Sequence, residues 1–262
     1  DFDEWLDDYL LKKYQFNSFV YSLNKIHFPE SLLDVENKEK FRQRLSIDEL
    51  ISNYFAIRYL KEKTKKKELP LNLDNNEQLL AIQKLPFQLT EKQSQAINLI
   101  NQLNKSNYRE NMLLQGDVGS GKTIIALLTA LPFITSGYQV AYMAPTEILA
   151  QQIFDNLKTL ITSPNIFSTL LTGSTKNKPE IYDKIKKNEI NFVIGTHAIF
   201  QEKLIFYNLS YVIIDEQHRF GVQQRLLLAE KGINTNILLM SATPIPRTLA
   251  LAQYGEIEQI IV

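Results

Sequence analysis

The chain has 262 residues, of which 29 are basic and 29 acidic, and it contains no cysteine. The absence of cysteine excludes disulfides, thiolate metal sites and a catalytic thiol. The net charge of zero gives no global signal for nucleic-acid binding, so any such contact must come from local features. At about 150 residues per domain, the length indicates one large domain or two smaller ones.

The N-terminus and the apolar runs carry no targeting or membrane signal. Residues 1–8 are acidic and lack the apolar core of a signal peptide. The longest apolar run, residues 124–134, is interrupted by Thr129 and Pro132 and is shorter than the roughly 20 residues that a membrane span needs. We therefore expect a soluble, cytoplasmic protein with no membrane partner.

The N-terminal third contains no glycine and many charged residues, and residues 40–63 carry apolar side chains spaced for one face of a helix. Ser46 and Glu49 have the spacing of a capping box, which predicts that the main helix begins at Ser46. The basic run at 61–68 is typical of a solvated helix end, and a nucleic-acid patch is the alternative.

A domain boundary is expected near residue 85. Pro70 and the polar residues 72–77 indicate a linker, and Leu85-Pro86-Phe87 marks the entry into a region of different rhythm. We therefore assign residues 1–85 to a helical linker or brace segment and residues 86–262 to a second domain.

Short apolar runs alternate with helical patterns after Phe87. Strands are expected at 112–115, 139–143, 167–171, 191–195, 211–215, 237–241 and 258–262, and helices at 91–103, 123–131, 147–161, 179–187 and 223–230. Such alternation predicts an α/β fold with a parallel sheet and helices on both faces. Ligand-binding residues are then expected where the strands end, at the carboxyl edge of the sheet.

A phosphate-binding loop follows the first expected strand. The sequence Gly-Asp-Val-Gly-Ser-Gly-Lys-Thr at 116–123 matches the pattern G-x-x-x-x-G-K-[ST] between a strand and a helix. Glycines let the backbone approach phosphates, while lysine adds a full charge and the hydroxyl can ligate Mg²⁺. We expect ATP with Mg²⁺ to contact Gly116, Asp117, Val118, Gly119, Ser120, Gly121, Lys122 and Thr123.

Two carboxylates end the strand expected at 211–215. In a phosphate-loop protein this is the place for a Mg²⁺-holding acid, which makes Asp215 the metal partner together with Thr123. Glu216 is the candidate for orienting or deprotonating the attacking water. The catalytic set expected from these patterns is Lys122, Asp215 and Glu216.

Further motifs resemble those of DExH-type helicases, in the order typical of that family. They are Phe-Gln-Leu-Thr-Glu-Lys-Gln at 87–93, Ala-Pro-Thr-Glu at 144–147, Leu-Thr-Gly-Ser at 171–174, Gly-Thr-His-Ala at 195–198, Asp-Glu-Gln-His at 215–218 and Ser-Ala-Thr at 241–243. The resemblance implies a RecA-like domain in which Phe87 and Gln93 contact adenine. It implies nucleic-acid contacts at Pro145, Thr146, Thr172, Gly173, Thr196 and His197, and coupling roles for His218, Ser241 and Thr243.

Longer strings at 215–225 and 240–250 resemble the RecG family of bacterial ATP-dependent DNA translocases, as does Ile-His-Phe-Pro-Glu at 26–30. The alternative is the translocase module of the transcription-repair coupling factor, although Gln217 and Gln-Gln-Arg at 223–225 favour RecG. The resemblance implies the ATP-binding motor domain of a helicase that remodels branched DNA in repair and recombination.

The same resemblance implies that the chain is a fragment. RecG motors have a second RecA-like domain with an arginine finger and an N-terminal OB-fold wedge, and neither is found here. We expect a monomer that hydrolyses ATP slowly without these partner domains.

Simpler roles compete with several of these assignments. Gln93 lies three residues after Thr90, a capping-box spacing, and Phe87 could fill a core. The threonines lie at loop or helix starts, where small polar residues are common. His197 and His218 could be packed polar residues. A phosphate-loop kinase or nucleotide switch is the second functional class, but the sequence contains neither a recognisable acceptor site nor the guanine reader Asn-Lys-x-Asp.

Overall fold

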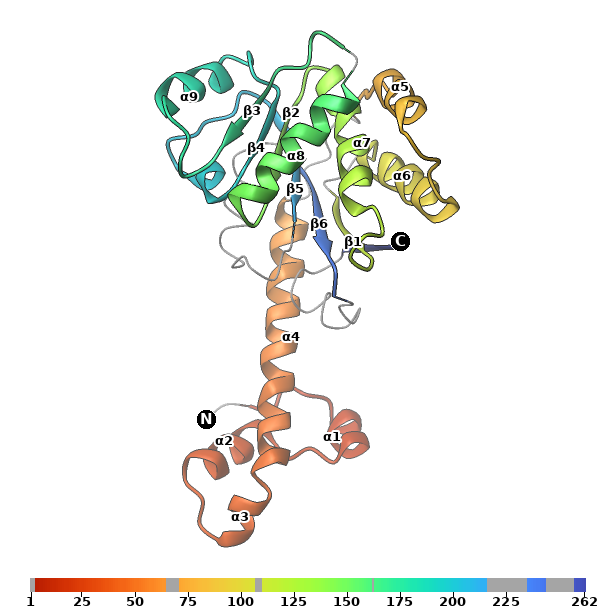
Figure 1. Ribbon diagram of the computed structural model, residues 1–262. Helices are drawn as coiled ribbons and strands as arrows, with labels where there is room; N and C mark the ends of the chain where they lie inside the picture. Colours follow the sequence, from red (N-terminus) through yellow and green to blue (C-terminus); the bar gives the residue numbers. More distant parts are fainter. Residues whose placement is uncertain (1–2, 65–70, 107–109, 162, 216–234, 244–256) are drawn as a thin grey trace. The chain divides into compact units, whose positions relative to one another are not determined.

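The computed structural model describes residues 3–262 except 65–70, 107–109, 162, 216–234 and 244–256, and it omits the side chains of 53, 56–64 and 200 (Figure 1). The chain divides after Thr64 into two compact units. Among the described helices, none has both the length and the apolar character to cross a bilayer.

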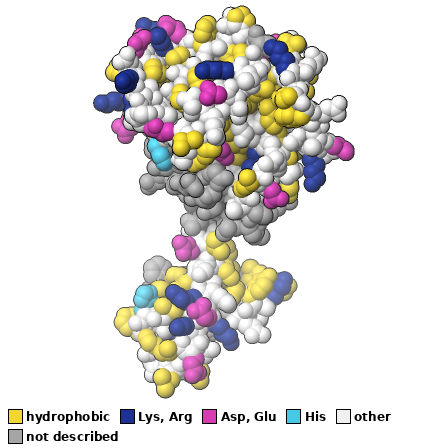
Figure 2. Space-filling view, in the orientation of Figure 1, with side chains coloured by type: hydrophobic (Ala, Val, Ile, Leu, Met, Phe, Trp, Pro, Cys, Tyr) yellow, Lys and Arg dark blue, Asp and Glu magenta, His cyan; other side chains and the backbone are white. Residues whose placement is uncertain are grey.

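The first unit is helical, as its composition predicts. It consists of α1 (Asp8–Tyr14), α2 (Phe19–His27), α3 (Leu32–Glu36) and the long α4 (Lys38–Thr64). Side-chain oxygens of Asp7, Ser18 and Ser31 cap the first three helices. Apolar side chains remain exposed on this unit, among them Phe28 and Leu32 (yellow on the part that carries α1–α4 in Figure 2).

The predicted helix start at Ser46 is wrong, because α4 begins at Lys38 and Ser46 lies within it. Phe41 is buried and packs edge-on against Tyr21 of α2, with ring centroids 5.9 Å apart. Burial of this apolar side chain extends the helix on the N-terminal side of the capping-box pattern.

Arg44 of α4 is fully buried and ties the N-terminal segment to the helix. Its guanidinium donates to Glu4 Oε1 at 2.6 Å, to the Asn17 carbonyl at 3.2 Å and to Asp48. It also lies 5.8 Å from the Trp5 ring centroid. A buried charge is tolerated when it is paired and hydrogen-bonded in this way.

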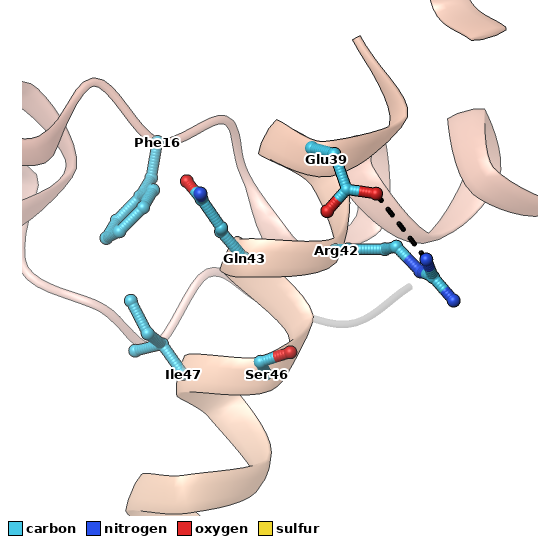
Figure 3. A pocket seen from close by; sticks show the side chains of 6 residues that line it. All are labelled: Phe16, Glu39, Arg42, Gln43, Ser46 and Ile47. Carbon is cyan, nitrogen blue, oxygen red and sulfur yellow. Dashed lines mark hydrogen bonds and ion pairs between the residues drawn. The ribbon is translucent and has the colours of Figure 1, made fainter.

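A shallow pocket opens beside α4 in the first unit (Figure 3). Among its lining residues, Arg42 and Glu39 form an exposed ion pair at 3.5 Å on its rim. None of the residues assigned a catalytic, nucleotide-binding, metal-binding, nucleic-acid-binding or coupling role from the sequence lines this pocket, whose full set is Phe16, Glu39, Arg42, Gln43, Ser46 and Ile47.

The described part of the second unit contains a seven-stranded parallel sheet, which confirms the predicted fold class. The strand order is β3-β4-β2-β5-β6-β1-β7. All seven strands were expected, to within two residues at each end. Their bounds are β1 Asn111–Gln115, β2 Gln139–Met143, β3 Ser168–Leu171, β4 Phe192–Gly195, β5 Leu209–Ile214, β6 Asn236–Ser241 and β7 Glu258–Ile261.

Helices of this unit are α5 (Asn76–Lys84), α6 (Glu91–Asn104), α7 (Lys122–Thr135), α8 (Glu147–Leu160) and α9 (Lys178–Lys186), with a 3₁₀ turn η1 (His197–Phe200) (Figure 1). Four of these helices match the sequence predictions. The helix expected at 223–230 lies outside the described residues.

The core joins one face of the sheet to α6, α7 and α8. Alternate strand residues point to this face, including Tyr142 of β2, Tyr211 of β5 and Met240 of β6. Phe133 of α7 stacks on Tyr211 with ring centroids 4.6 Å apart. Ten consecutive residues of α7 are buried, so this helix is held rigidly behind the phosphate loop.

Helix α5 belongs to the second unit and packs against α7, although the sequence pattern assigned residues 72–77 to a linker. Gln78 of α5 is buried and donates to the Leu128 carbonyl at 2.9 Å. Pro132 lacks the N–H that would normally bind this carbonyl. Gln78 therefore supplies the donor that Pro132 removes. Because α5 belongs to the second unit, the division of the chain into two units falls after Thr64 and not at residue 85.

Candidate functional site

From the phosphate loop onward, every described residue to which the sequence assigns a functional role lies at the carboxyl edge of the sheet, as predicted. Loops leave β1 at Gly116, β5 at Asp215 and β6 at Ser241, on three neighbouring strands. The loops after β2, β4 and β3 lie on the other side of β5, and their first expected nucleic-acid residues are Pro145, Thr196 and Thr172, respectively. The edge thus has a phosphate-loop half and a half with the expected nucleic-acid motifs.

The phosphate loop is held in the conformation that its glycines permit. Gly119 and Gly121 have φ values of 85° and 89°, a region that favours glycine. A Cβ on Gly121 would collide with the Gln93 side-chain amide. The tip residue Val118 is 89% exposed, so the loop faces solvent.

Lys122 begins α7 and turns back over the loop. Its ammonium donates to the carbonyls of Gly116 at 2.6 Å and Asp117 at 2.8 Å. Helix α7 has no acidic residue in its first turn, in contrast to α5, α6, α8 and α9. A cationic side chain at an acid-free helix N-terminus fits an anionic phosphate group.

Gln93 caps α6 and also holds the phosphate loop. Its Oε1 accepts from the Thr90 N–H at 2.9 Å, which completes a capping box with the Thr90 hydroxyl. Its Nε2 donates to the Ser120 carbonyl at 2.8 Å. The capping role weighed from the sequence is confirmed, and the bond to the loop was not foreseen. Phe87 is 51% exposed and so does not fill a core.

Asp215 and Thr123 both lie near the hydroxyl of a buried tyrosine, Tyr142. The Asp215 N–H donates to the Met143 carbonyl at 2.9 Å, which fixes the end of β5 against β2. Burial raises the pKa of Tyr142 well above its usual value, the charge of Asp215 raises it further, and the Thr123 hydroxyl opposes the shift. A hydroxyl and a carboxylate are oxygen ligands of the kind Mg²⁺ prefers. Glu216 and His218 lie outside the described residues.

Ser241 connects the Ser-Ala-Thr turn with the phosphate loop. Its carbonyl accepts from the Gly116 N–H at 3.3 Å. Its buried hydroxyl accepts from the Thr243 N–H at 3.2 Å and donates to the Thr243 carbonyl at 2.9 Å. A movement of the phosphate loop can therefore be transmitted to this turn through a backbone hydrogen bond.

The expected nucleic-acid residues differ in exposure. Thr172 and Thr196 are only 2% and 8% exposed, whereas Gly173 and His197 are exposed. Thr146 caps α8 by accepting from the Leu149 N–H at 3.3 Å, and Pro145 beside it is half-buried. The structure brings these residues to one part of the sheet edge but leaves the two buried threonines in supporting positions.

Glu147 joins two of these loops, a role that its motif does not reveal. Its carboxylate accepts from the Ser174 hydroxyl at 2.7 Å and from the Ser174 N–H at 3.3 Å. The Ser174 hydroxyl holds the pKa of Glu147 below its usual value. An acidic residue directly after a helix-capping threonine was the available signal, but its partner lies 27 residues away.

Comparisons with known proteins agree with these motifs. A family model for DEAD/DEAH box helicases matches residues 90–252. The chain is 44% identical to the ATP-dependent DNA helicase RecG of Aquifex aeolicus over 100% of its length, and 46% identical to that of Borreliella burgdorferi over 95%. It covers 34% and 36% of these proteins, so it spans about a third of the length of the curated relatives it matches.

Solved structures give the same picture. The chain superimposes over its whole length on RecG bound to a three-way DNA junction, with a TM-score of 0.74 and 38% identity, and covers 35% of that chain. A DEAD box protein from the hyperthermophile Methanococcus jannaschii gives a TM-score of 0.56 and 26% identity over 73% of this chain and 54% of its own. The family model spans more than half of the sequence, and the chain therefore belongs to the DEAD/DEAH box helicase family.

Proposed function

We propose that this chain is the ATP-binding half of the motor of a RecG-type DNA helicase, which remodels branched DNA during repair and recombination. The observation that carries the proposal is the sheet edge, where the phosphate loop after β1 is bonded to Ser241 of the Ser-Ala-Thr turn after β6. A kinase or nucleotide switch has no need of this second motif beside its phosphate loop.

In this proposal ATP binds with its phosphates on the loop from Gly116 to Thr123. Lys122 would exchange its bonds to loop carbonyls for bonds to the β- and γ-phosphate oxygens, and Thr123 and Asp215 would hold Mg²⁺, which would supply positive charge beside the phosphates. Glu216 orients the attacking water. The adenine stacks on exposed Phe87 and is read by Gln93, which must then release a bond to Thr90 or Ser120.

DNA is proposed to lie across the loops that follow β2, β4 and β3. Exposed Gly173 and His197, with Pro145 and Thr146, would contact the phosphate backbone without reading sequence. Buried Thr172 and Thr196 would shape the loops. The RecG structure that this chain resembles is bound to a three-way DNA junction.

The parent protein is proposed to be a cytoplasmic monomer in which a wedge domain and a second RecA-like domain complete the motor. The share of the RecG relatives that this chain covers supports further domains. Exposed apolar side chains such as Phe28, directly after α2, and Leu32 of α3 support contacts of the first unit with one of these domains.

Calorimetric titration with ADP and Mg²⁺ tests the nucleotide site. Lys122→Ala removes a charge-assisted contact worth about 1.5–3 kcal/mol, so we expect the affinity to fall about tenfold or more. Lys184→Ala is the control, because Lys184 is exposed and paired with Glu180 on α9. Equal affinity of wild type and Lys122→Ala would refute the site.

A further inference from the structure

Tyr142 of β2 carries a hydroxyl group that the fold itself does not use. The side chain is fully buried, and its hydroxyl has no hydrogen-bond partner of ordinary geometry among the described residues. Buried hydroxyls are nearly always paired, and an unpaired one lowers stability compared with a phenyl ring of the same shape. A phenylalanine would therefore pack equally well at this position and would leave nothing unpaired.

Tyr211 on the adjacent strand provides a direct contrast. It is also fully buried and faces the same side of the sheet, but its hydroxyl lies 3.2 Å from the Thr129 hydroxyl of α7. Two tyrosines on neighbouring strands thus have the same burial and different hydrogen bonding. Only the one close to the carboxyl edge is unpaired.

The position of Tyr142 places its hydroxyl beside both proposed Mg²⁺ ligands. Tyr142 is paired in register with Ile213, and the following residue, Met143, accepts the N–H of Asp215. The Thr123 hydroxyl lies close enough for a loose contact with the Tyr142 hydroxyl, and the Asp215 carboxylate lies close enough to act on it electrostatically.

A metal held by Thr123 and Asp215 would create partners for this group. A threonine hydroxyl that gives a lone pair to a metal keeps its proton and needs an acceptor for it. A carboxylate with one oxygen on the metal has a second oxygen that accepts a hydrogen bond. A tyrosine hydroxyl can accept the first bond and donate the second.

We propose that Tyr142 is a positioning residue for the Mg²⁺ that accompanies the nucleotide, accepting from the Thr123 hydroxyl and donating to the Asp215 carboxylate. This inference rests on the proposed function, because it needs Mg²⁺ at these two ligands. Tyr142 touches neither nucleotide nor metal; it fixes the orientation of the groups that do. Outer partners of metal ligands typically change metal affinity by about 10–100-fold when they are removed.

The test is a Mg²⁺ titration of Tyr142→Phe at fixed ADP, with nucleotide binding followed by a fluorescent ADP analogue. We expect the Mg²⁺ concentration that gives half of the maximal increase in analogue binding, the Mg²⁺ midpoint, to rise about tenfold relative to wild type. The affinity for the analogue in EDTA should stay unchanged. The melting temperature without ligand should change little, because the hydroxyl makes only a contact with Thr123 that falls outside ordinary hydrogen-bond geometry.

Tyr211→Phe is the matched control. It should lower the melting temperature, because the bond to Thr129 is lost, and leave the Mg²⁺ midpoint where it is in wild type. The inference would be overturned if Tyr142→Phe had the same Mg²⁺ midpoint as wild type, whatever the melting temperature of the variant. Wild-type binding that shows no Mg²⁺ dependence at all would instead overturn the proposed metal site, and with it this inference.

Discussion

Glu147 shows how a single carboxylate can organise the loops at the sheet edge. It stands at the start of α8, where the helix dipole already favours negative charge, and its side chain reaches the loop after β3. The Ser174 hydroxyl is the largest cause of its lowered pKa, and backbone N–H groups of Ser174 and Gly173 act in the same direction. Because Glu147 is bonded to Ser174, it fixes the spacing of the two loops, which are among those proposed to contact DNA.

Ser174→Ala should therefore raise the pKa of the Glu147 carboxyl toward its usual value of 4.5. Because the folded-state pKa is lowered, the ionised carboxylate stabilises the fold above the unfolded-state pKa, and this contribution is lost as pH falls through the folded-state value. Carboxyl NMR titration measures the change. Glu180, whose pKa is lowered by Lys184, is the internal reference and should not move. An unchanged Glu147 pKa would contradict the role of Ser174.

Sequence spacing is most informative for the phosphate loop, because the chemistry of phosphate binding restricts both residue type and order. It predicts less about side chains whose partners are distant in the chain. Gln93 was predicted to contact adenine, with a helix cap as the alternative, but its bond to Ser120 joins residues 27 positions apart. Tyr142 has no sequence signal at all, since an aromatic residue in a buried strand is ordinary.

At the scale of elements, α7 combines a phosphate loop with an internal proline. The predicted helix stopped at residue 131 because Pro132 disfavours continuation, yet the helix extends to Thr135. The Leu128 carbonyl, which Pro132 leaves without its helical donor, accepts from Gln78 of α5. Gln78 is in turn bonded to Asn101 of α6 at 2.8 Å, so three helices share one polar junction.

A double-mutant cycle tests this junction. Gln78→Ala should lower the free energy of unfolding by about 1–3 kcal/mol, because a buried carbonyl loses its donor. The same change should cost less in a Pro132→Ala background, where the helix supplies an N–H to Leu128 again. Loss of the Asn101 contact is common to both backgrounds and cancels. Urea denaturation gives the four values, and equal costs in the two backgrounds would exclude the compensation.

The strands were predictable because all seven are short segments between polar turns and because β1, β2, β4, β5 and β6 are largely buried runs rich in apolar residues. The start of helix α5 was not, because it falls in a polar stretch of sequence and the contacts of Gln78 with Leu128 and Asn101 form only in the folded unit. The capping-box pattern at Ser46 failed for a related reason: burial of Phe41 against Tyr21 decides where α4 starts. Local patterns yield to tertiary packing at each of these places.

At the scale of the whole molecule, the described site residues all belong to the second unit, and the first unit has a polar centre of its own. Arg44 is that centre, with Glu4, Asp48 and the Asn17 carbonyl as partners. The only tryptophan of the chain, Trp5, lies against its guanidinium. Tryptophan fluorescence therefore reports on the first unit, while nucleotide binding reports on the second.

Arg44→Ala should separate these two readouts. Removing one partner of a buried ion pair typically costs about 3–5 kcal/mol, since the remaining charges lose their compensation. We expect the urea midpoint followed by Trp5 fluorescence to fall and the emission in buffer to shift to longer wavelength. Arg42→Ala on the same helix is the control, because the exposed Arg42–Glu39 pair contributes little to stability.

The affinity for ADP with Mg²⁺ should stay at the wild-type value in both variants, since every nucleotide contact proposed above comes from the second unit. Wild-type Trp5 emission in Arg44→Ala would show that the N-terminal segment is held by something other than this arginine.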